Sequence, residues 1–325
     1  MDLELLRGRA GIIRQVRSFF DGRNYLETDT PLLAPNLIPE SCLEVFETYR
    51  IPPAGSRAAE KPYWLIPSPE IWMKRLIAEH AANMYQICKC FRNGESSGRF
   101  HSPEFTMLEY YTMEADYLES LRLTEELFSF LLKDVNAHND LLPPFSRLSV
   151  EEAFRRWAGV DLYGASSSPG AMEEEARRLG LAPSPGLSVQ ELYDIIFIHS
   201  VEPRLKEEGA IALMDYPAFI PCLAKKSRDG KTVERWELYV RGIELANCYT
   251  EETDAAEVRR FFKSEKAAKE KAALVRHSVD DDFWKIFGPG KRFPPCSGVA
   301  MGLDRLIMVM CGRNTLDGIL PFPME

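Results

Sequence analysis

The chain has 325 residues, of which 45% are hydrophobic, and it carries a formal net charge of −9 at pH 7. This length and apolar content suffice for one large domain or two with a buried core. The acidic balance disfavours a broad nucleic-acid surface, which needs clustered Lys and Arg. No apolar run approaches the roughly 18 residues of a transmembrane helix, so no membrane partner is expected.

The first third of the chain predicts a helix followed by short strands. Apolar residues recur at helical spacing over residues 3–21, and Gly22 follows as a stop. Residues 25–33 read as a strand with Pro31 near its end, and residues 50–61 as a surface loop. A short strand at 63–66 then leads to a helix running to about Glu79, with Ser68 as its expected cap and Pro69 in its first turn.

The remainder alternates between apolar strands and helices. Buried antiparallel strands are expected at 84–91 and 105–113, followed by a helix at 117–135 and a linker at 136–146. Residues 149–209 read as helices separated by Gly, Pro and Ser, which indicates a helical insertion. Strands then return at 211–215, 235–240 and 243–248, a charged helix at 254–276, and a last strand and helix at 297–301 and 303–311. This order predicts one discontinuous α+β domain spanning residues 1–325.

The seven cysteines are odd in number and lack the spacing of a zinc site or of disulfide pairs. We therefore expect reduced core thiols, with Cys88 and Cys90 on the same face of one strand. The acidic N-terminus lacks the layout of a signal peptide, so a cytoplasmic protein is expected.

The segment from Phe91 to Phe105 reads FRNGESSGRFHSPEF and carries groups suited to a nucleotide. Arg92 offers a rigid donor fork for phosphate, Glu95 can accept from an exocyclic amine, and Phe105 offers a flat face for a base. Together they can hold a bent nucleotide triphosphate. The alternative is an ordinary β-hairpin with a charged turn.

A second block, from Glu237 to Glu251, holds three carboxylates at intervals of seven residues. Odd spacing in one continuous strand alternates faces, but a turn at Arg241-Gly242 would put Glu237 and Glu244 on adjacent strands facing one site. Such a pair suits Mg²⁺, which takes one or two carboxylates plus substrate phosphates. The alternative is that these glutamates are solvated on the strand surface. This alternative is disfavoured because Glu244 lies among apolar residues and is expected to be buried with a partner.

In a third block, CSGVAMGLDRL, an apolar strand reaches Gly302 and a helix begins with Asp304 and Arg305 in its first turn. A salt bridge at a helix start would explain this pair without any ligand.

In their order and spacing, these blocks resemble motifs 2 and 3 of class II aminoacyl-tRNA synthetases, and the 3–33 helix and strand resemble the dimerisation motif 1. The chain is most similar to the elongation factor P–lysine lysyltransferase family, a truncated lysyl-type branch. Three features favour that branch: no anticodon-binding barrel is expected before the first helix, Ala300 stands where lysyl enzymes generally carry Gly, and residues 93–95 read Asn-Gly-Glu. The loop carries one extra residue at Ser96-Ser97, and Ser102 replaces the usual Asn.

The resemblance implies a class II synthetase-like antiparallel sheet flanked by helices, a homodimer, and ATP and Mg²⁺ as cofactors. It implies catalytic roles for Arg92 and Arg305 and a metal site at Glu237 and Glu244. It assigns ATP contacts to Arg92, Asn93, Glu95, His101, Ser102, Phe105, Glu244, Leu245, Gly302 and Arg305. It assigns substrate contacts to Ser68, Glu70, Glu109, Tyr111, Asn247, Glu251 and Ala300, with Glu109 and Glu251 facing the ε-ammonium of lysine.

The activity implied is ATP-dependent activation of lysine or β-lysine as the adenylate, then transfer to a lysine side chain of elongation factor P. Carboxylates at both ends of a pocket suit a substrate with two ammonium groups. One alternative is a ligase for a tRNA or small-molecule acceptor, with tRNA disfavoured by the acidic charge. The other is a non-catalytic paralogue that binds lysine or ATP, which would require loss of a phosphate arginine or a metal glutamate.

Overall fold

The computed structural model describes residues 2–56, 59–94, 98–133, 139–288 and 293–322. Its chain forms two compact parts, which are described separately. The first consists of residues 1–115 and 251–325, and the second of residues 116–250. Helices and strands make up both parts, as the predicted α+β class requires. No helix in the described ranges has the length and apolarity needed to cross a bilayer.

The first part is built on four strands in the order β1-β5-β6-β11. Strand β5 (Met84–Phe91) pairs antiparallel with β6 (Glu104–Met113), and β6 pairs antiparallel with β11 (Cys296–Gly302). At the edge, β1 (Leu26–Glu27) runs parallel to β5, so the sheet is mixed rather than purely antiparallel as predicted.

Helix α1 (Leu3–Asp21) covers one face of these strands, and its apolar stripe explains why it forms. The Phe20 ring lies 4.9 Å from the ring centroids of both Tyr85 and Tyr110, which are paired on β5 and β6. Because strand side chains alternate, the neighbours Glu109 and Tyr111 point to the opposite face. The other helices of this part are α2 (Glu70–His80), α9 (Ala255–Ala272) and α10 (Leu303–Met310), with the 3₁₀ turn η4 (Phe283–Phe287).

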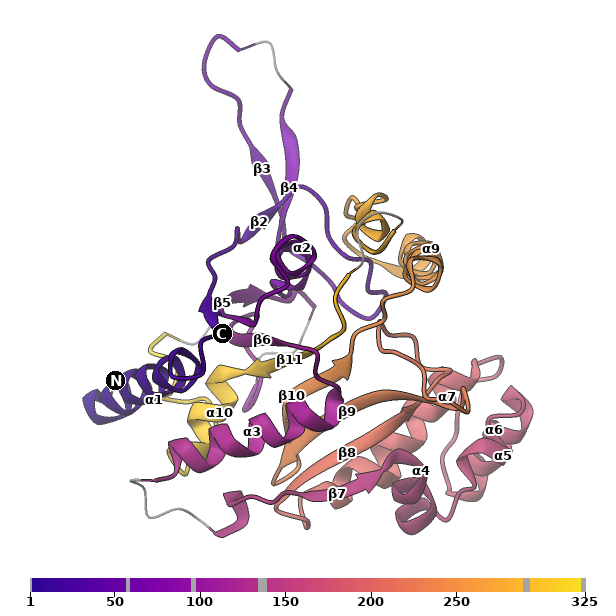
Figure 1. The fold of residues 1–325 in the computed structure, drawn as a ribbon. Helices are drawn as coiled ribbons and strands as arrows, with labels where there is room; N and C mark the ends of the chain where they lie inside the picture. The colour runs from indigo at the N-terminus through magenta and orange to yellow at the C-terminus, as the bar shows by residue number, and fades with distance from the viewer. Residues whose placement is uncertain (1, 57–58, 95–97, 134–138, 289–292, 323–325) are drawn as a thin grey trace. The chain divides into compact units, whose positions relative to one another are not determined.

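The predicted continuous strand at 25–33 is wrong. The segment divides into β1 and β2 (Leu33–Ala34), because Thr28 already directs its N–H and hydroxyl to the Tyr85 carbonyl and Pro31 offers no N–H to continue a ladder. Strand β2 instead joins β4 (Lys61–Leu65) and β3 (Glu47–Arg50) in a second, three-stranded sheet. Figure 1 shows β3 and β4 extending away from the strands of the main sheet as an arm.

The second part has strands in the order β10-β9-β8-β7, namely Ile243–Thr250, Thr232–Val240, Ala210–Pro217 and Ser146–Ser149. The stretch predicted as a helical insertion contains α4 (Val150–Ala153), α5 (Leu162–Ala165), α6 (Pro169–Arg178), α7 (Val189–Ile196) and α8 (Glu202–Leu205), with π-helical turns η2 (Phe154–Ala158) and η3 (Phe197–Val201). Their apolar faces form a core with β8 and β9 around Phe154, Tyr193 and Leu213. That residues 149–209 form an insertion within a single domain stays a prediction.

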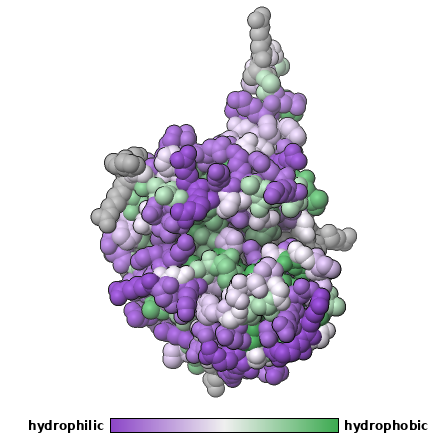
Figure 2. Space-filling model, turned by 90° about the vertical axis from the view of Figure 1, so that its right-hand side faces the viewer, coloured by the Kyte–Doolittle hydropathy of each residue, from purple (hydrophilic) through white to green (hydrophobic). Residues whose placement is uncertain are grey.

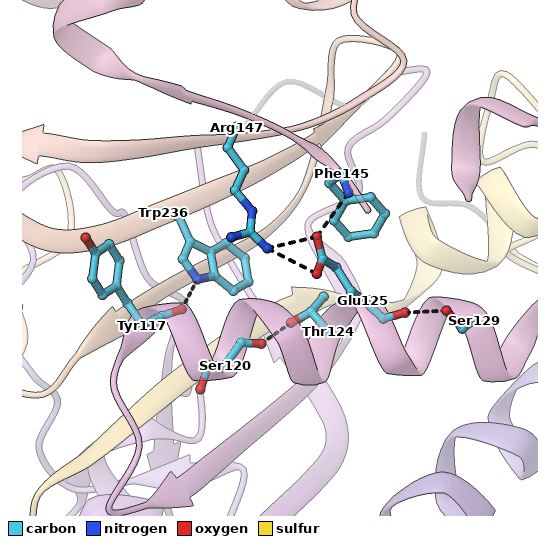
Figure 3. Close-up of polar contacts among 8 residues, drawn as sticks. All are labelled: Tyr117, Ser120, Thr124, Glu125, Ser129, Phe145, Arg147 and Trp236. Atoms are coloured by element: carbon cyan, nitrogen blue, oxygen red, sulfur yellow. Dashed lines mark hydrogen bonds and ion pairs between the residues drawn. The ribbon is translucent and has the colours of Figure 1, made fainter. Parts of the chain in front are cut away.

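Helix α3 (Tyr117–Leu131) is fixed to these strands by polar contacts at its start and near its middle (Figure 3). The 3₁₀ turn η1 (Asn139–Leu141) follows it. The Trp236 indole N–H donates to the Tyr117 carbonyl at 2.6 Å. The Glu125 carboxylate accepts from the Phe145 N–H at 3.0 Å and from the Arg147 guanidinium at 3.2 Å. These bonds anchor the start of β7 against the helix.

The surface facing the viewer in Figure 2 is mainly hydrophilic, and its hydrophobic residues lie in small separate patches. That distribution is usual for a folded chain with 27% charged residues.

Candidate active site

One face of the first part gathers most of the predicted substrate residues. Glu109 and Tyr111 lie two residues apart on β6, directly opposite Ala300 and Gly298 on β11. Directly paired residues point to the same face of a sheet, so two long polar side chains stand beside two very small ones. The small residues let long polar side chains pack directly against the backbone of β11.

Gly298 is required at its position. A Cβ there would lie 2.5 Å from Tyr111 Cε1 and 2.7 Å from Glu251 Oε1, closer than real Cβ contacts. The backbone of β11 therefore packs directly against the polar groups of Tyr111 and Glu251. These three residues of the predicted pocket are in contact.

The start of helix α2 contacts the polar residues on this face. Its first residue is Glu70 and its N-cap position is Pro69, one residue later than the predicted cap Ser68. The Ser68 hydroxyl nevertheless accepts from the Glu70 N–H at 3.1 Å, and it donates to Glu109 Oε2 at 2.6 Å. Ser68 therefore links the helix start to the carboxylate on β6.

A buried lysine lies at the centre of these carboxylates. Lys74 follows Glu70 by four residues on α2, so both point from the same helix face. The Lys74 ammonium pairs with Glu70 Oε1 and, at 2.7 Å, with Glu251 Oε2. Lys74 is 0% exposed, and Glu109 and Glu251 are each 2% exposed. Tyr111 completes the cluster by donating its hydroxyl to Glu109 Oε1 at 2.7 Å.

Burial governs the ionisation of this cluster. It raises the pKa of Glu109 to about 7, with the Glu70 charge adding to the effect, while hydrogen bonds from Ser68 and Tyr111 oppose it. Burial also raises the pKa of Glu251 to about 8, opposed by the Lys74 charge. For Lys74, burial disfavours the ammonium, but Glu251 and Glu70 outweigh it and raise its pKa above the usual range. Lys74 is therefore charged at neutral pH.

The predicted nucleotide residues of the first part lie at the other end of the same β6 face. Phe105 and Glu109 are four residues apart on β6, which corresponds to about 13 Å along a strand. The Arg92 guanidinium lies 5.3 Å from the centroid of the Phe105 ring. Any ligand that contacts both Phe105 and Glu109 must be elongated.

Arg305 is held by the start of α10. Its Nε donates to the Phe100 carbonyl at 3.0 Å. The neighbouring Asp304 accepts from Arg9 of α1 at 2.5 Å and from the Thr106 N–H of β6 at 2.6 Å. The predicted helix start is confirmed, and the Asp304 side chain fixes it to both α1 and β6.

The remaining loop residues have mixed surroundings. The Asn93 side chain bonds the backbone, accepting from the Gly94 N–H at 2.9 Å and donating to the Val45 carbonyl at 3.4 Å. His101 is exposed and Ser102 is buried, while Gly302 ends β11. Glu95 lies outside the described residues. These ATP-contact assignments stay predictions.

The remaining site residues lie in the second part, on the β9–β10 hairpin. The predicted turn is present, and Arg241 and Gly242 both have positive φ, at 52° and 76°. Glu237 is paired with Asn247, and Tyr239 with Glu244. A bulge between Glu244 and Ala246 shifts the register by one residue. It thereby brings side chains at odd spacing to the same face.

The surroundings of the two hairpin glutamates differ. Glu237 is buried and accepts from the hydroxyls of Tyr216 at 2.5 Å and Tyr239 at 2.7 Å, and it pairs with Arg235 at 2.5 Å. Glu244 is exposed, so the expectation that it is buried among apolar residues is wrong. The bulge accounts for this, because Leu245 and Ala246 are buried in its place.

These donors suit a hard cation that takes few protein ligands. Carboxylate oxygens are the ligands of Mg²⁺, which commonly keeps waters and phosphates as its other ligands. Within the described ranges, no group of three or more His, Cys, Asp or Glu side chains is arranged to enclose a metal by itself. Glu237 and Glu244 are carboxylates of the type that such a cation takes, and the metal site stays a prediction.

Two charged residues of the first part were missed from the sequence. The four-residue spacing between Glu70 and Lys74 predicts that they pair on one helix face, but it does not predict the burial of Lys74. Glu40 could not be predicted, because its segment is held by distant bonds: the Lys269 ammonium donates to the Glu40 carbonyl at 2.9 Å and Glu265 accepts from the Ser41 N–H at 2.8 Å. Burial and the Glu70 charge raise the pKa of Glu40 to about 7, and Arg92 opposes them.

Comparison with known proteins agrees with this geometry. The family described as tRNA synthetases class II (D, K and N) matches residues 3–325. The chain belongs to this family.

The chain is also 34% identical over 324 residues to the "Elongation factor P--(R)-beta-lysine ligase" of Avibacterium paragallinarum, covering 99% of this chain and 96% of the relative. The protein of the same name from Hamiltonella defensa subsp. Acyrthosiphon pisum (strain 5AT) is 34% identical over 320 residues, or 98% and 94% of the two chains. Both the class II fold and the resemblance to the lysyltransferase branch are thereby confirmed.

Proposed function

We propose that this protein is an ATP-dependent ligase that activates lysine or β-lysine as its adenylate and transfers it to a lysine side chain of elongation factor P. Membership of the class II family and the names of two full-length relatives support this proposal. The observation that carries it is the carboxylate cluster of Glu70, Glu109 and Glu251, in which Glu109 and Glu251 are buried and Glu70 is half-buried. A substrate with two ammonium groups needs such carboxylates, because its charges must leave water to bind.

The proposed reaction has two steps. The substrate carboxylate attacks the α-phosphate of ATP and pyrophosphate leaves. An amine on the acceptor protein then attacks the adenylate carbonyl and AMP leaves. In this proposal Arg92 stabilises the charge at the α-phosphate and Arg305 binds the γ-phosphate, so positioning and charge stabilisation supply most of the catalysis.

A bound Mg²⁺ would neutralise phosphate charge during adenylation. Glu244 and Glu237 are the side chains that would hold it. The Tyr216 and Tyr239 hydroxyls and Arg235 would keep the Glu237 carboxylate oriented. We also propose a homodimer that uses the 3–33 segment.

ATP–pyrophosphate exchange tests the activation step. Lysine and (R)-β-lysine should support exchange, and norleucine, which lacks the second ammonium, should not. Absence of exchange with every diammonium amino acid would contradict the proposal and favour a non-catalytic paralogue. Exchange followed by charging of tRNA, with elongation factor P left unmodified, would favour the tRNA ligase alternative.

A further inference from the structure

Lys74 places a protein ammonium inside a pocket that we propose receives substrate ammonium groups. It is wholly buried and pairs with Glu70 Oε1 and with Glu251 Oε2 at 2.7 Å. Both carboxylates belong to the predicted substrate site. Lys74 lies in the protein core, but its ammonium changes the net charge that a bound ligand would meet.

The charges around the pocket can be counted. Above about pH 8, where Glu109 and Glu251 are ionised, Glu70, Glu109 and Glu251 contribute three negative charges, and Lys74 removes one. Glu40 interacts electrostatically with both Glu70 and Arg92, and above this pH the Glu40 and Arg92 charges are opposite. The neighbouring Tyr111 and Cys296 are neutral at pH 7. The net charge is −2, equal and opposite to the two ammonium groups of lysine or β-lysine.

We propose that Lys74 is a positioning residue whose buried ammonium sets the pocket charge to match a diammonium substrate and holds Glu70 and Glu251 in place. This inference rests on the proposed function. With a neutral residue at position 74 the pocket would carry −3, and one carboxylate would remain unpaired or take up a proton when substrate binds. Either outcome weakens binding of the substrate.

A purely structural role for Lys74 is the alternative. It is less favourable, because replacing a buried ion pair by apolar residues of similar size is often neutral or stabilising. A buried lysine between two carboxylates therefore needs a reason other than stability. Charge matching to the substrate supplies one.

The test is a cycle of three variants in the full-length protein, Lys74→Met, Glu251→Gln and the double variant. Both single variants leave the pocket charge unbalanced, at −3 and −1, whereas the double variant restores −2. We expect each single substitution to raise the KM for lysine and (R)-β-lysine about tenfold or more. The double variant should have a lower KM than either single variant, with the KM for ATP unchanged throughout.

Lys89→Met is the matched control, since Lys89 pairs with Glu104 at 3.2 Å on the surface of the same part. It should leave both KM values unchanged. Thermal unfolding of every variant separates loss of fold from loss of binding. If Lys74→Met does not fold, comparison of the double variant with Glu251→Gln alone decides the question.

A double variant no better than Glu251→Gln, in a wild-type protein that does exchange with lysine, would overturn the charge-matching role and leave the proposed function intact. Wild-type protein that exchanges with no diammonium amino acid would overturn both.

Discussion

Arg9 of α1 and Asp304 of α10 form an ion pair of 2.5 Å although 295 positions separate them in sequence. Arg9 also donates to the Thr106 hydroxyl at 2.9 Å, while Asp304 accepts from the Thr106 N–H. The pair therefore joins the first helix, the central strand and the residue that precedes Arg305. Its side chains are 13% and 3% exposed, so solvent screens it little.

Arg9→Met should lower the free energy of unfolding by about 3 kcal/mol, because it leaves the Asp304 carboxylate buried without its cation. Chemical denaturation measures this directly. Arg17→Met on the same helix is the control: Arg17 and Glu27 are 43% and 37% exposed, and such pairs contribute about 1 kcal/mol or less. Equal losses in the two variants would contradict the structural role of Asp304.

Arg305→Ala should lower the rate of lysine-dependent pyrophosphate exchange by about 10²–10³-fold, the usual loss for one charge-stabilising donor. Its fold should be kept, because Arg305 is half-buried and Asp304 stays in place. The exposed Arg313, three residues after the end of α10, supplies a control in Arg313→Ala. Near-normal exchange in the Arg305 variant would remove the γ-phosphate assignment.

Gly298→Ala should raise the KM for lysine much more than the KM for ATP. The added methyl group would push against Tyr111 and Glu251, whereas Phe105 lies further along the strand. Steady-state kinetics with each substrate varied in turn measures the two effects. In Gly170→Ala the new Cβ meets only the Ser168 hydroxyl at 4.0 Å, so that variant should match the wild type. Unchanged lysine kinetics in Gly298→Ala would place the pocket elsewhere.

Lysine affinity should rise with pH through about 7 to 8, because Glu109 and Glu251 have pKa values raised to about 7 and about 8 and attract an ammonium only when ionised. The stability of the protein alone should change in the opposite direction. Between their ordinary pKa and the raised one, the folded state binds more protons than the unfolded state, so stability falls as pH rises. Calorimetric titration with lysine and thermal unfolding across this range measure the two trends. A lysine affinity independent of pH would contradict the buried-carboxylate pocket.

Much of the fold could be predicted from residue patterns. The α1 stripe, the β5–β6 pair and the β11–α10 junction have strong periodicity or turn chemistry, and the structure places them where they were expected. The strand at 25–33 was not predictable in detail. Its division depends on hydrogen bonds to Tyr85 and on pairing with β4, which are contacts remote in sequence.

The site was predictable in its residue types more than in its partners. Pairing of Glu109 with the Ser68 hydroxyl follows from the meeting of α2 and β6, which no local pattern indicates. The exposure of Glu244 depends on a bulge of one residue. Lys74 was overlooked because a lysine four residues after a glutamate is usually a solvated helix pair, and only tertiary packing buries it.

Mass spectrometry of elongation factor P after incubation with this protein, ATP, Mg²⁺ and (R)-β-lysine or lysine tests the central claim most directly. The account predicts a mass increase of one aminoacyl residue on a single lysine side chain of elongation factor P. This gain should require both ATP and the amino acid and be lost in Arg305→Ala. Elongation factor P of unchanged mass, under conditions where the protein forms the adenylate, would contradict it.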